Sequence, residues 1–241
     1  MLQQVIQFIT DPQYHFAQET LITLELSVVS ILLAIVIGIP IGILVAQRPI
    51  AAFLAANLSG LARAIPTLAF LAISLPLLGI GFKPSVVALI ALGIPPILLN
   101  TIAGLRGIDP ATIDAGRGMG MSSMQVLTRI QIPLVLPVIA AGVRTSAVQI
   151  VATVPLAALI GGQGYGDYIT LGLSGEAHYN ELILGALAIA LLALLVELLM
   201  AAVQRAATPA GLRIETPKDV EVEEGGEGGA GTPTPAPVAV S

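Results

Sequence analysis

The sequence predicts an all-α membrane protein with about five transmembrane helices, or six on an alternative count. Of its 241 residues, 56% are hydrophobic and only 10% are charged, whereas a soluble domain carries about 25% charged residues. The mean hydropathy of +0.93 agrees with this composition. Apolar runs of about 20 residues recur along the chain, and each is long enough to cross a hydrocarbon core of roughly 30 Å.

Five stretches have the length and composition of a membrane span. Several contain proline or glycine, such as Pro95 and Pro96 in the third, and membrane helices tolerate these residues better than soluble ones do. A sixth span, made from residues 51–61 or from the glycine-rich segment 161–179, remains an alternative. The expected spans are residues 21–45, 58–78, 85–105, 134–158 and 182–203.

The two ends of the chain differ in composition from the membrane domain, which we place at residues 21–207. Residues 1–20 are expected to form a short amphipathic or irregular lead-in outside the cytoplasm. They contain no Lys or Arg, so we expect no cleavable secretory signal. Residues 208–241 are rich in Glu, Gly, Pro and Thr, which predicts a disordered tail. Its acidic residues largely account for the net charge of −5: Glu215, Asp219, Glu221, Glu223, Glu224 and Glu227.

Basic residues orient the expected spans, because Lys and Arg favour cytoplasmic loops. Lys83 lies in a loop on one side of the membrane. The loops on the other side and the segment after the fifth span carry Arg48, Arg106, Arg117, Arg129, Arg205, Arg213 and Lys218. The arginine-bearing loops are therefore expected to be cytoplasmic, and the N-terminus and the segment 161–179 are expected to face outward.

The polar loop of residues 106–133 has the sequence pattern of a helix–turn–helix. Asp109 followed by Pro110 is a helix start, because Asp accepts from free backbone N–H groups and Pro suits the first helical position. Gly118 and Gly120 offer the positive φ that ends a helix and turns the chain.

A second short helix is expected after this turn. Ser122 with Gln125 forms a possible capping box at its start. Met124, Leu127 and Ile130 then give it an apolar stripe at helical spacing. Pro133 is expected to stop this helix before the fourth span begins.

The same loop resembles the cytoplasmic signature of ABC importer permeases. That signature reads Glu-Ala-Ala, three residues, Gly, nine residues, Ile, one residue and Leu-Pro. The chain has this spacing throughout, in Asp114, Ala115, Gly116, Gly120, Ile130, Ile132 and Pro133. It departs conservatively at three positions, with Asp114 for Glu, Gly116 for Ala and Ile132 for Leu.

The resemblance implies the transmembrane domain of a type I ABC importer, in the plasma or inner membrane of a bacterium or archaeon. Two permease chains, as two copies or as homologues, would form the pathway within the lipid bilayer. Two cytoplasmic ATPase subunits would bind the signature loop and hydrolyse ATP, and an external binding protein would deliver the substrate. The chain lacks the sequence G-x-x-x-x-G-K-[ST], so the ATPase is expected to be another polypeptide.

Shorter motifs resemble the osmoprotectant permeases, which import glycine betaine, carnitine, choline or related compatible solutes. They are the sequences at residues 64–69, 100–101, 142–145 and 161–166. Permeases for methionine or other amino acids are the alternative within the same superfamily.

Three polar residues within the expected spans are candidates for lining the pathway or for anchoring helices. Arg144 lies about midway through the fourth span, where a charge is costly and faces the bundle interior or water. As an anchor it would pair with Glu25, with Glu197 or with backbone carbonyls. Asn100 is the third candidate.

The sequence offers little for other functions. There is no cysteine, and the two histidines lie far apart, so we expect neither a metal site nor a cofactor. No basic patch points to nucleic acid. A membrane enzyme would need acid–base residues beyond Asp109 and Asp114, and a membrane protein without a transport role is the remaining alternative.

Overall fold

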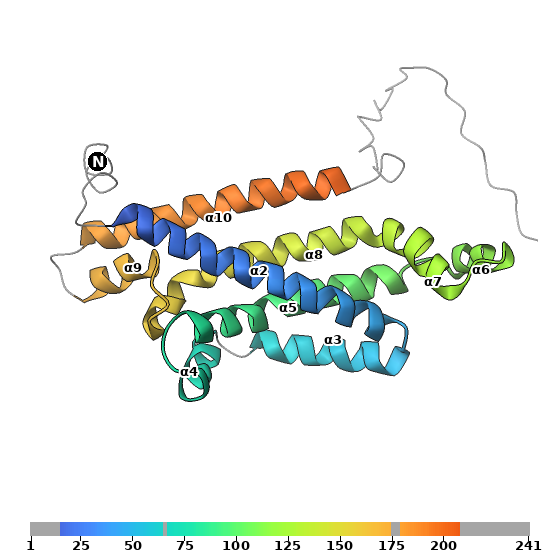
Figure 1. The fold of residues 1–241 in the computed structure, drawn as a ribbon, viewed down its shortest axis with the longest axis horizontal. Coiled ribbons are helices and arrows are strands. Elements are labelled where there is room, and N and C mark those ends of the chain that lie inside the picture. Colours follow the sequence, from blue (N-terminus) through green and yellow to red (C-terminus); the bar gives the residue numbers. More distant parts are fainter. Residues whose placement is uncertain (1–14, 65–66, 175–178, 208–241) are drawn as a thin grey trace, which may run out of the picture. The chain divides into compact units, whose positions relative to one another are not determined.

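The computed structural model describes residues 15–64, 67–174 and 179–207, which all belong to one compact unit. Every regular element of this described part is a helix (Figure 1). Most are α-helices, η2 is a π-helix and η3 is a 3₁₀-helix. Their bounds are α2 Phe16–Ala46, α3 Pro49–Ala64, α4 Thr67–Leu78, α5 Phe82–Arg106, α6 Pro110–Gly118, α7 Ser123–Val126, η2 Leu127–Gln131, α8 Ile132–Thr153, η3 Val154–Ile160, α9 Gly166–Leu173 and α10 Tyr179–Ala207.

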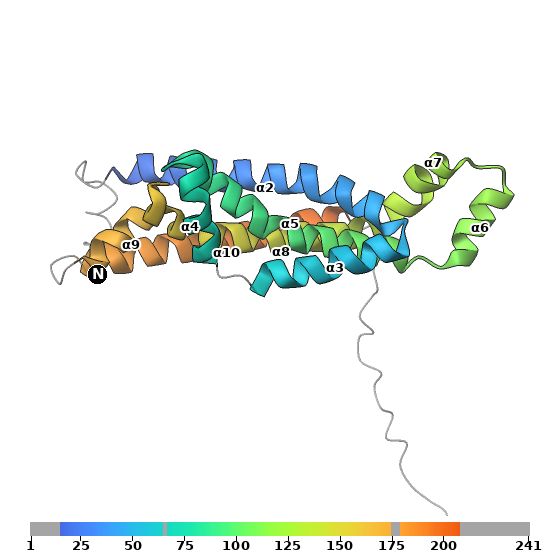
Figure 2. The ribbon, with the colours of Figure 1, turned by 90° about the horizontal axis from the view of Figure 1, so that it is seen from below.

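Four helices in the described residues are long and apolar enough to cross a membrane, which confirms the first, third, fourth and fifth expected spans. They are α2, α5, the continuous helical segment Ser123–Ile160, and α10. They run roughly along one direction, with α5 between α2 and α8 and with α10 beside α8 (Figures 1 and 2). The first of them starts at Phe16 rather than at Leu21, so the end of the expected lead-in is helical. Residues 1–14 and the tail of residues 208–241 lie outside the described residues.

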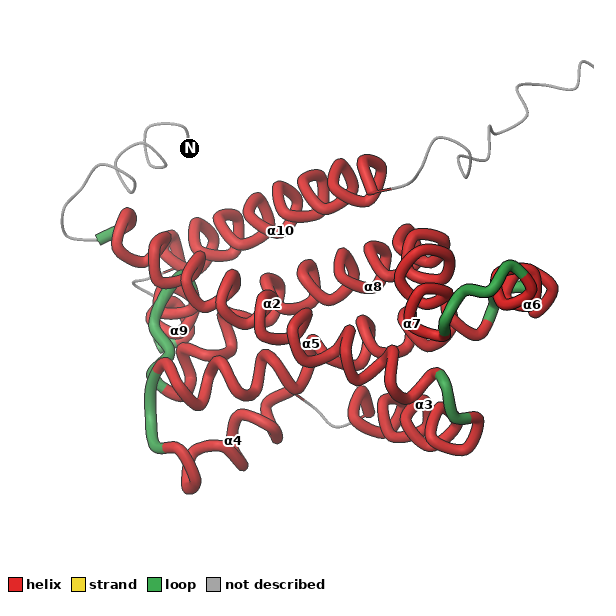
Figure 3. Tube along the Cα trace, turned by 45° about the vertical axis from the view of Figure 1, so that its right-hand side comes forward, coloured by secondary structure: helices red, strands yellow, loops and turns green. Residues whose placement is uncertain are grey.

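The expected second span, residues 58–78, is wrong as one continuous helix. The structure has two shorter helices instead, α3 and α4, on either side of residues 65–66. Residues 65–66 lie outside the described residues. Arg63 lies near the C-terminal end of α3. α3 lies along α5, and α4 lies at the end of α5 nearer to η3 (Figure 3).

Small residues bring α5 close to its two long neighbours. A Cβ placed on Gly93 would lie 2.6 Å from Cδ1 of Ile150 on α8 and 3.2 Å from Cβ of Ala34 on α2. The hydroxyl of Ser146, which is fully buried, donates to the carbonyl of Gly93 at 2.8 Å. Such close approach of backbones is how membrane helices gain packing without a hydrophobic driving force.

The fourth span differs from its expected start. Pro133 does not stop the short cytoplasmic helix, because α7, η2 and α8 continue into one another. In the π-turn before the proline, the N–H of Ile132 donates to the carbonyl of Leu127. A π-turn accommodates the missing donor of Pro133 within a continuous helix. The second arm of the hairpin is therefore rigidly joined to a membrane span.

At the opposite end of the bundle, the start of α2 holds the glycine-rich connection between η3 and α9. Oε2 of Glu19 accepts from the N–H of Gly164 at 2.7 Å, and Oγ1 of Thr23 accepts from the N–H of Tyr165 at 2.9 Å. Tyr165 and Tyr168 are both buried. Burial raises the pKa of the Tyr168 phenol above its ordinary value.

Candidate functional site

The signature loop forms a hairpin of two short helices that projects beyond the ends of α5 and α8 (Figures 2 and 3). Its first arm, α6, begins as the sequence predicts. Oδ1 of Asp109 accepts from the N–H of Ala111 at 2.9 Å, and Pro110 occupies the first helical position. This cap satisfies one of the free N–H groups at the helix start.

The turn after α6 is a Schellman motif centred on Gly120. Gly120 has a φ of 81°. Its N–H donates to the carbonyl of Arg117 at 2.9 Å, and the N–H of Met121 donates to the carbonyl of Gly116 at 3.2 Å. These two bonds satisfy carbonyls that the helix end leaves free. Gly118 does not share this conformation, contrary to the expectation, because it is still the last residue of α6.

The second arm begins with the expected capping box. Oγ of Ser122 accepts from the N–H of Gln125 at 3.3 Å, and Oε1 of Gln125 accepts from the N–H of Ser122 at 2.8 Å. The reciprocal bonds fix the direction in which the second arm leaves the turn. Both arms of the hairpin therefore have defined starts.

The two arms pack at Gly116, which is buried. A Cβ on Gly116 would lie 2.6 Å from Cδ1 of Ile130 and 3.5 Å from Cγ2 of Val126. The signature has Ala where this chain has Gly116, and the absence of a Cβ at Gly116 makes room for Ile130. The expected stripe is partly wrong, since Val126 is buried whereas Met124 is 68% exposed.

The outer surface of the hairpin leaves several residues of the signature open to a partner. Asp114, Ala115 and Pro133 are exposed. Asp114 lies 3.9 Å from Arg117 in a solvated pair, and such a pair contributes little stability. Met119 is 74% exposed. A groove of about 460 Å³ lies against the hairpin and is lined by Gln47, Ile113, Arg117, Ser123, Met124, Val126, Leu127 and Gln131.

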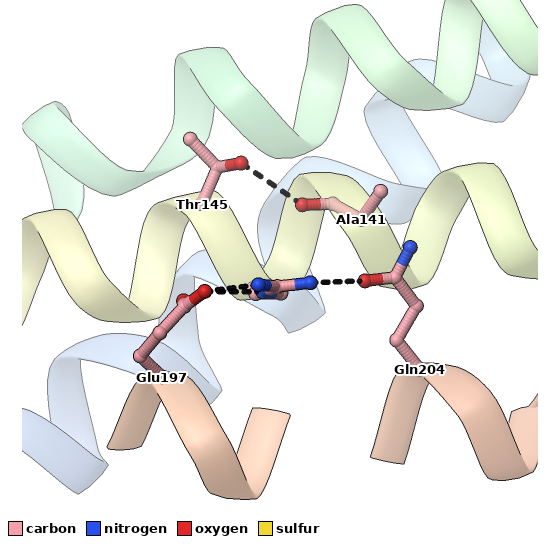
Figure 4. Close-up of polar contacts among 5 residues, drawn as sticks. Ala141, Thr145, Glu197 and Gln204 are labelled. Carbon is pink, nitrogen blue, oxygen red and sulfur yellow. Dashed lines mark hydrogen bonds and ion pairs between the residues drawn. The ribbon is translucent and has the colours of Figure 1, made fainter. Parts of the chain in front are cut away.

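Arg144 of α8 forms an ion pair with Glu197 of α10, one of the two carboxylate partners that the sequence suggests. The guanidinium donates through Nε to Oε1 of Glu197 at 2.9 Å, and a second nitrogen donates to the same oxygen. A third nitrogen donates to Oε1 of Gln204 at 3.1 Å. Glu197 and Gln204 project from α10 toward α8 (Figure 4). Gln204 was not foreseen, although its spacing of two helical turns from Glu197 places both on one face of a helix.

Glu25 and Asn100 lie apart from this pair. Glu25 is exposed on α2, and no hydrogen bond or ion pair of its side chain occurs within the described part of the chain. Asn100 donates to the carbonyl of Pro96 at 2.8 Å on its own helix. A Cβ on Gly142 would lie 2.7 Å from Cβ of Asn100, so Asn100 packs where α8 crosses α5. The structure therefore brings only Arg144 of the three candidates to a charged partner.

The described residues contain no candidate metal site. Within residues 15–64, 67–174 and 179–207, no three His, Asp or Glu side chains come together. Two polar features stand out in this part of the chain: the Arg144–Glu197 ion pair and the exposed hairpin.

Known proteins resemble the chain closely over most of its length. Residues 38–210 match the family model of the binding-protein-dependent transport system inner membrane component. A carnitine transport permease protein of Listeria monocytogenes is 36% identical over 92% of this chain and 99% of its own length. A choline transport system permease protein of Bacillus subtilis is 32% identical over 88% of this chain and 97% of its own length.

A solved structure has the same fold. An inward-facing methionine ABC transporter superposes with a TM-score of 0.72 at 22% identity, covering 83% of this chain and 100% of that one. Its fold confirms the type I importer architecture predicted from the signature. With its apolar helices and these relatives, the chain is a multi-pass membrane protein that belongs to the family of binding-protein-dependent transport system inner membrane components.

Proposed function

We propose that the chain forms, with a second permease chain, the translocation pathway of an ATP-driven importer for a compatible solute such as glycine betaine, carnitine or choline. The solute class is supported by relatives of different organisms whose names specify these compounds. One more is a glycine betaine/carnitine/choline permease of Bacillus subtilis, 35% identical over 79% of this chain and 87% of its own length. In this proposal the chain itself hydrolyses no ATP.

The observation that carries the proposal is the hairpin of α6 and α7. Its backbone is fixed by caps at Asp109 and Ser122 and by the turn at Gly120. Its exposed methionines, Met119 and Met124, offer a soft apolar surface, which is a common way to bind a partner protein. We assign this surface to a cytoplasmic ATPase subunit. Because α7 continues into α8, a displacement of the hairpin would be transmitted directly to a membrane span.

The solute itself would arrive from an extracytoplasmic binding protein at the end of the bundle that carries α9. Tyr165 and Tyr168, which lie in this region, are buried against α10 and Phe16. They are therefore positioned to shape the outer end of the bundle, and they do not form an exposed aromatic cage.

Uptake measurements test the proposed function. Cells that lack this chain should take up labelled glycine betaine, carnitine or choline under high salt more slowly than cells that contain it, while uptake of labelled methionine stays the same. The chain should also co-purify with an ATPase subunit. Loss of methionine uptake alone would instead assign the chain to the amino-acid branch.

A further inference from the structure

The two faces of α8 have opposite character. One face packs against α5 through residues that are small or apolar and buried, as at Gly142, Ser146 and Ile150. The other face, toward α10, carries Arg144 and Gln149. Arg144 lies about 18 Å along α8 from its start, at 1.5 Å per residue, and is therefore well inside the membrane. A charged residue at this depth requires a polar neighbourhood.

The ion pair of Arg144 and Glu197 borders open space instead of the packed core. The two side chains are 36% and 34% exposed. They line, with Gln149 and Gln204, an open pocket of about 590 Å³ between α8 and α10. A partly exposed ion pair is unfavourable against hydrocarbon, so this face must meet water or protein in the assembled transporter.

The pocket presents one positive and one negative group side by side. The Arg144 donors are directed at a single oxygen of Glu197 and at Gln204. Oε2 of Glu197 accepts no hydrogen bond from the described residues. The described residues that line the pocket include no aromatic side chain, so a quaternary ammonium would be held here by charge and not by cation–π contacts.

We propose that this pocket is a transit site for a zwitterionic solute, an inference that rests on the proposed function and names the part of the pathway that recognises the solute. The solute carboxylate takes over donors of Arg144, and its quaternary ammonium lies against Glu197. Every charge keeps an opposite neighbour during this exchange, which avoids leaving a charge unpaired within the membrane. Guanidinium is suited to this role because its planar fork matches a carboxylate.

The test compares two solutes that share the trimethylammonium group. Glycine betaine carries a carboxylate, whereas choline carries a hydroxyl in its place. Arg144→Gln should lower the rate of glycine betaine uptake at saturating solute by about tenfold relative to choline uptake, the effect of losing a charge-assisted hydrogen bond. Glu197→Gln should lower the uptake of both solutes. Rates are normalised to the amount of the chain in the same membranes.

Two further variants separate recognition from assembly. Lys83→Gln removes an exposed cation outside the pocket and should leave the betaine-to-choline ratio unchanged. Arg144→Lys keeps the charge and should reduce the ratio less than Arg144→Gln does; it takes the place of Arg144→Gln if that variant does not accumulate.

If both Arg144 variants keep the wild-type ratio of glycine betaine uptake to choline uptake, the transit site is overturned and the proposed function still stands. A wild-type chain that imports none of glycine betaine, carnitine and choline would overturn the proposed function, and the transit site with it.

Discussion

Gly120 allows the sharpest test of the hairpin, because its environment isolates a single physical effect. Its φ of 81° lies in the left-handed region, where an L-residue costs about 1–2 kcal/mol and a β-branched residue costs more. Apart from its two chain neighbours, a Cβ at this position would meet no atom within 4 Å. Any penalty of substitution therefore comes from the backbone conformation and not from a clash.

A graded series of variants follows from this reasoning. Gly120→Asn should be nearly normal, because Asn tolerates the left-handed conformation. Gly120→Ala should lower the population of the native turn by roughly 5- to 30-fold, which corresponds to about 1–2 kcal/mol. Gly120→Val should lower it further. Gly118 is the matched control, since it is exposed, has no contact within 4 Å of a Cβ, and lacks the positive φ.

Three quantities measured in the same membranes decide the outcome: the amount of the chain, solute uptake, and ATP hydrolysis by the co-purified ATPase. We expect Gly120→Val to insert normally, to lose uptake, and to bind the ATPase weakly or leave its hydrolysis uncoupled. Gly118→Val should behave as the wild type. Normal ATP-coupled uptake by Gly120→Val would refute the assignment of this hairpin as the coupling element, and equal damage from Gly118→Val would refute the conformational argument.

Three other predictions concern the bundle and the tail. Thr23→Val removes the acceptor for the buried N–H of Tyr165 and should cost about 1–3 kcal/mol, seen as a lower temperature of thermal unfolding; Thr23→Ser should be near normal, and equal behaviour of both would contradict the hydrogen-bond argument. Gly93→Ala places a methyl 2.6 Å from Cδ1 of Ile150 and should cost about 1–3 kcal/mol through overpacking; an unchanged unfolding temperature would show that α5 and α8 separate readily. Truncation after Ile214 should leave membrane insertion and uptake intact, and a large loss of assembled protein would disprove the expected dispensability of the tail.

Local sequence determined the parts of this protein that depend on short-range chemistry. A long apolar run crosses a membrane as a helix, because only a helix lets its backbone N–H and C=O groups bond within the segment itself. Asp109-Pro110, the Ser122–Gln125 pair and Gly120 act on their own backbone neighbours, so the hairpin was predictable from residue types alone.

Tertiary structure decided which side chains meet. Whether Arg144 pairs with Glu25 or Glu197 depends on which helix lies beside α8, and the spacing of residues along one helix contains no information about its neighbour. The continuity of α7 with α8 depends on a local π-turn that accommodates Pro133, a backbone form that the proline pattern does not indicate. Gly116 is buried by Ile130 from the other arm of the hairpin, a contact that exists only once the turn has brought the two arms together.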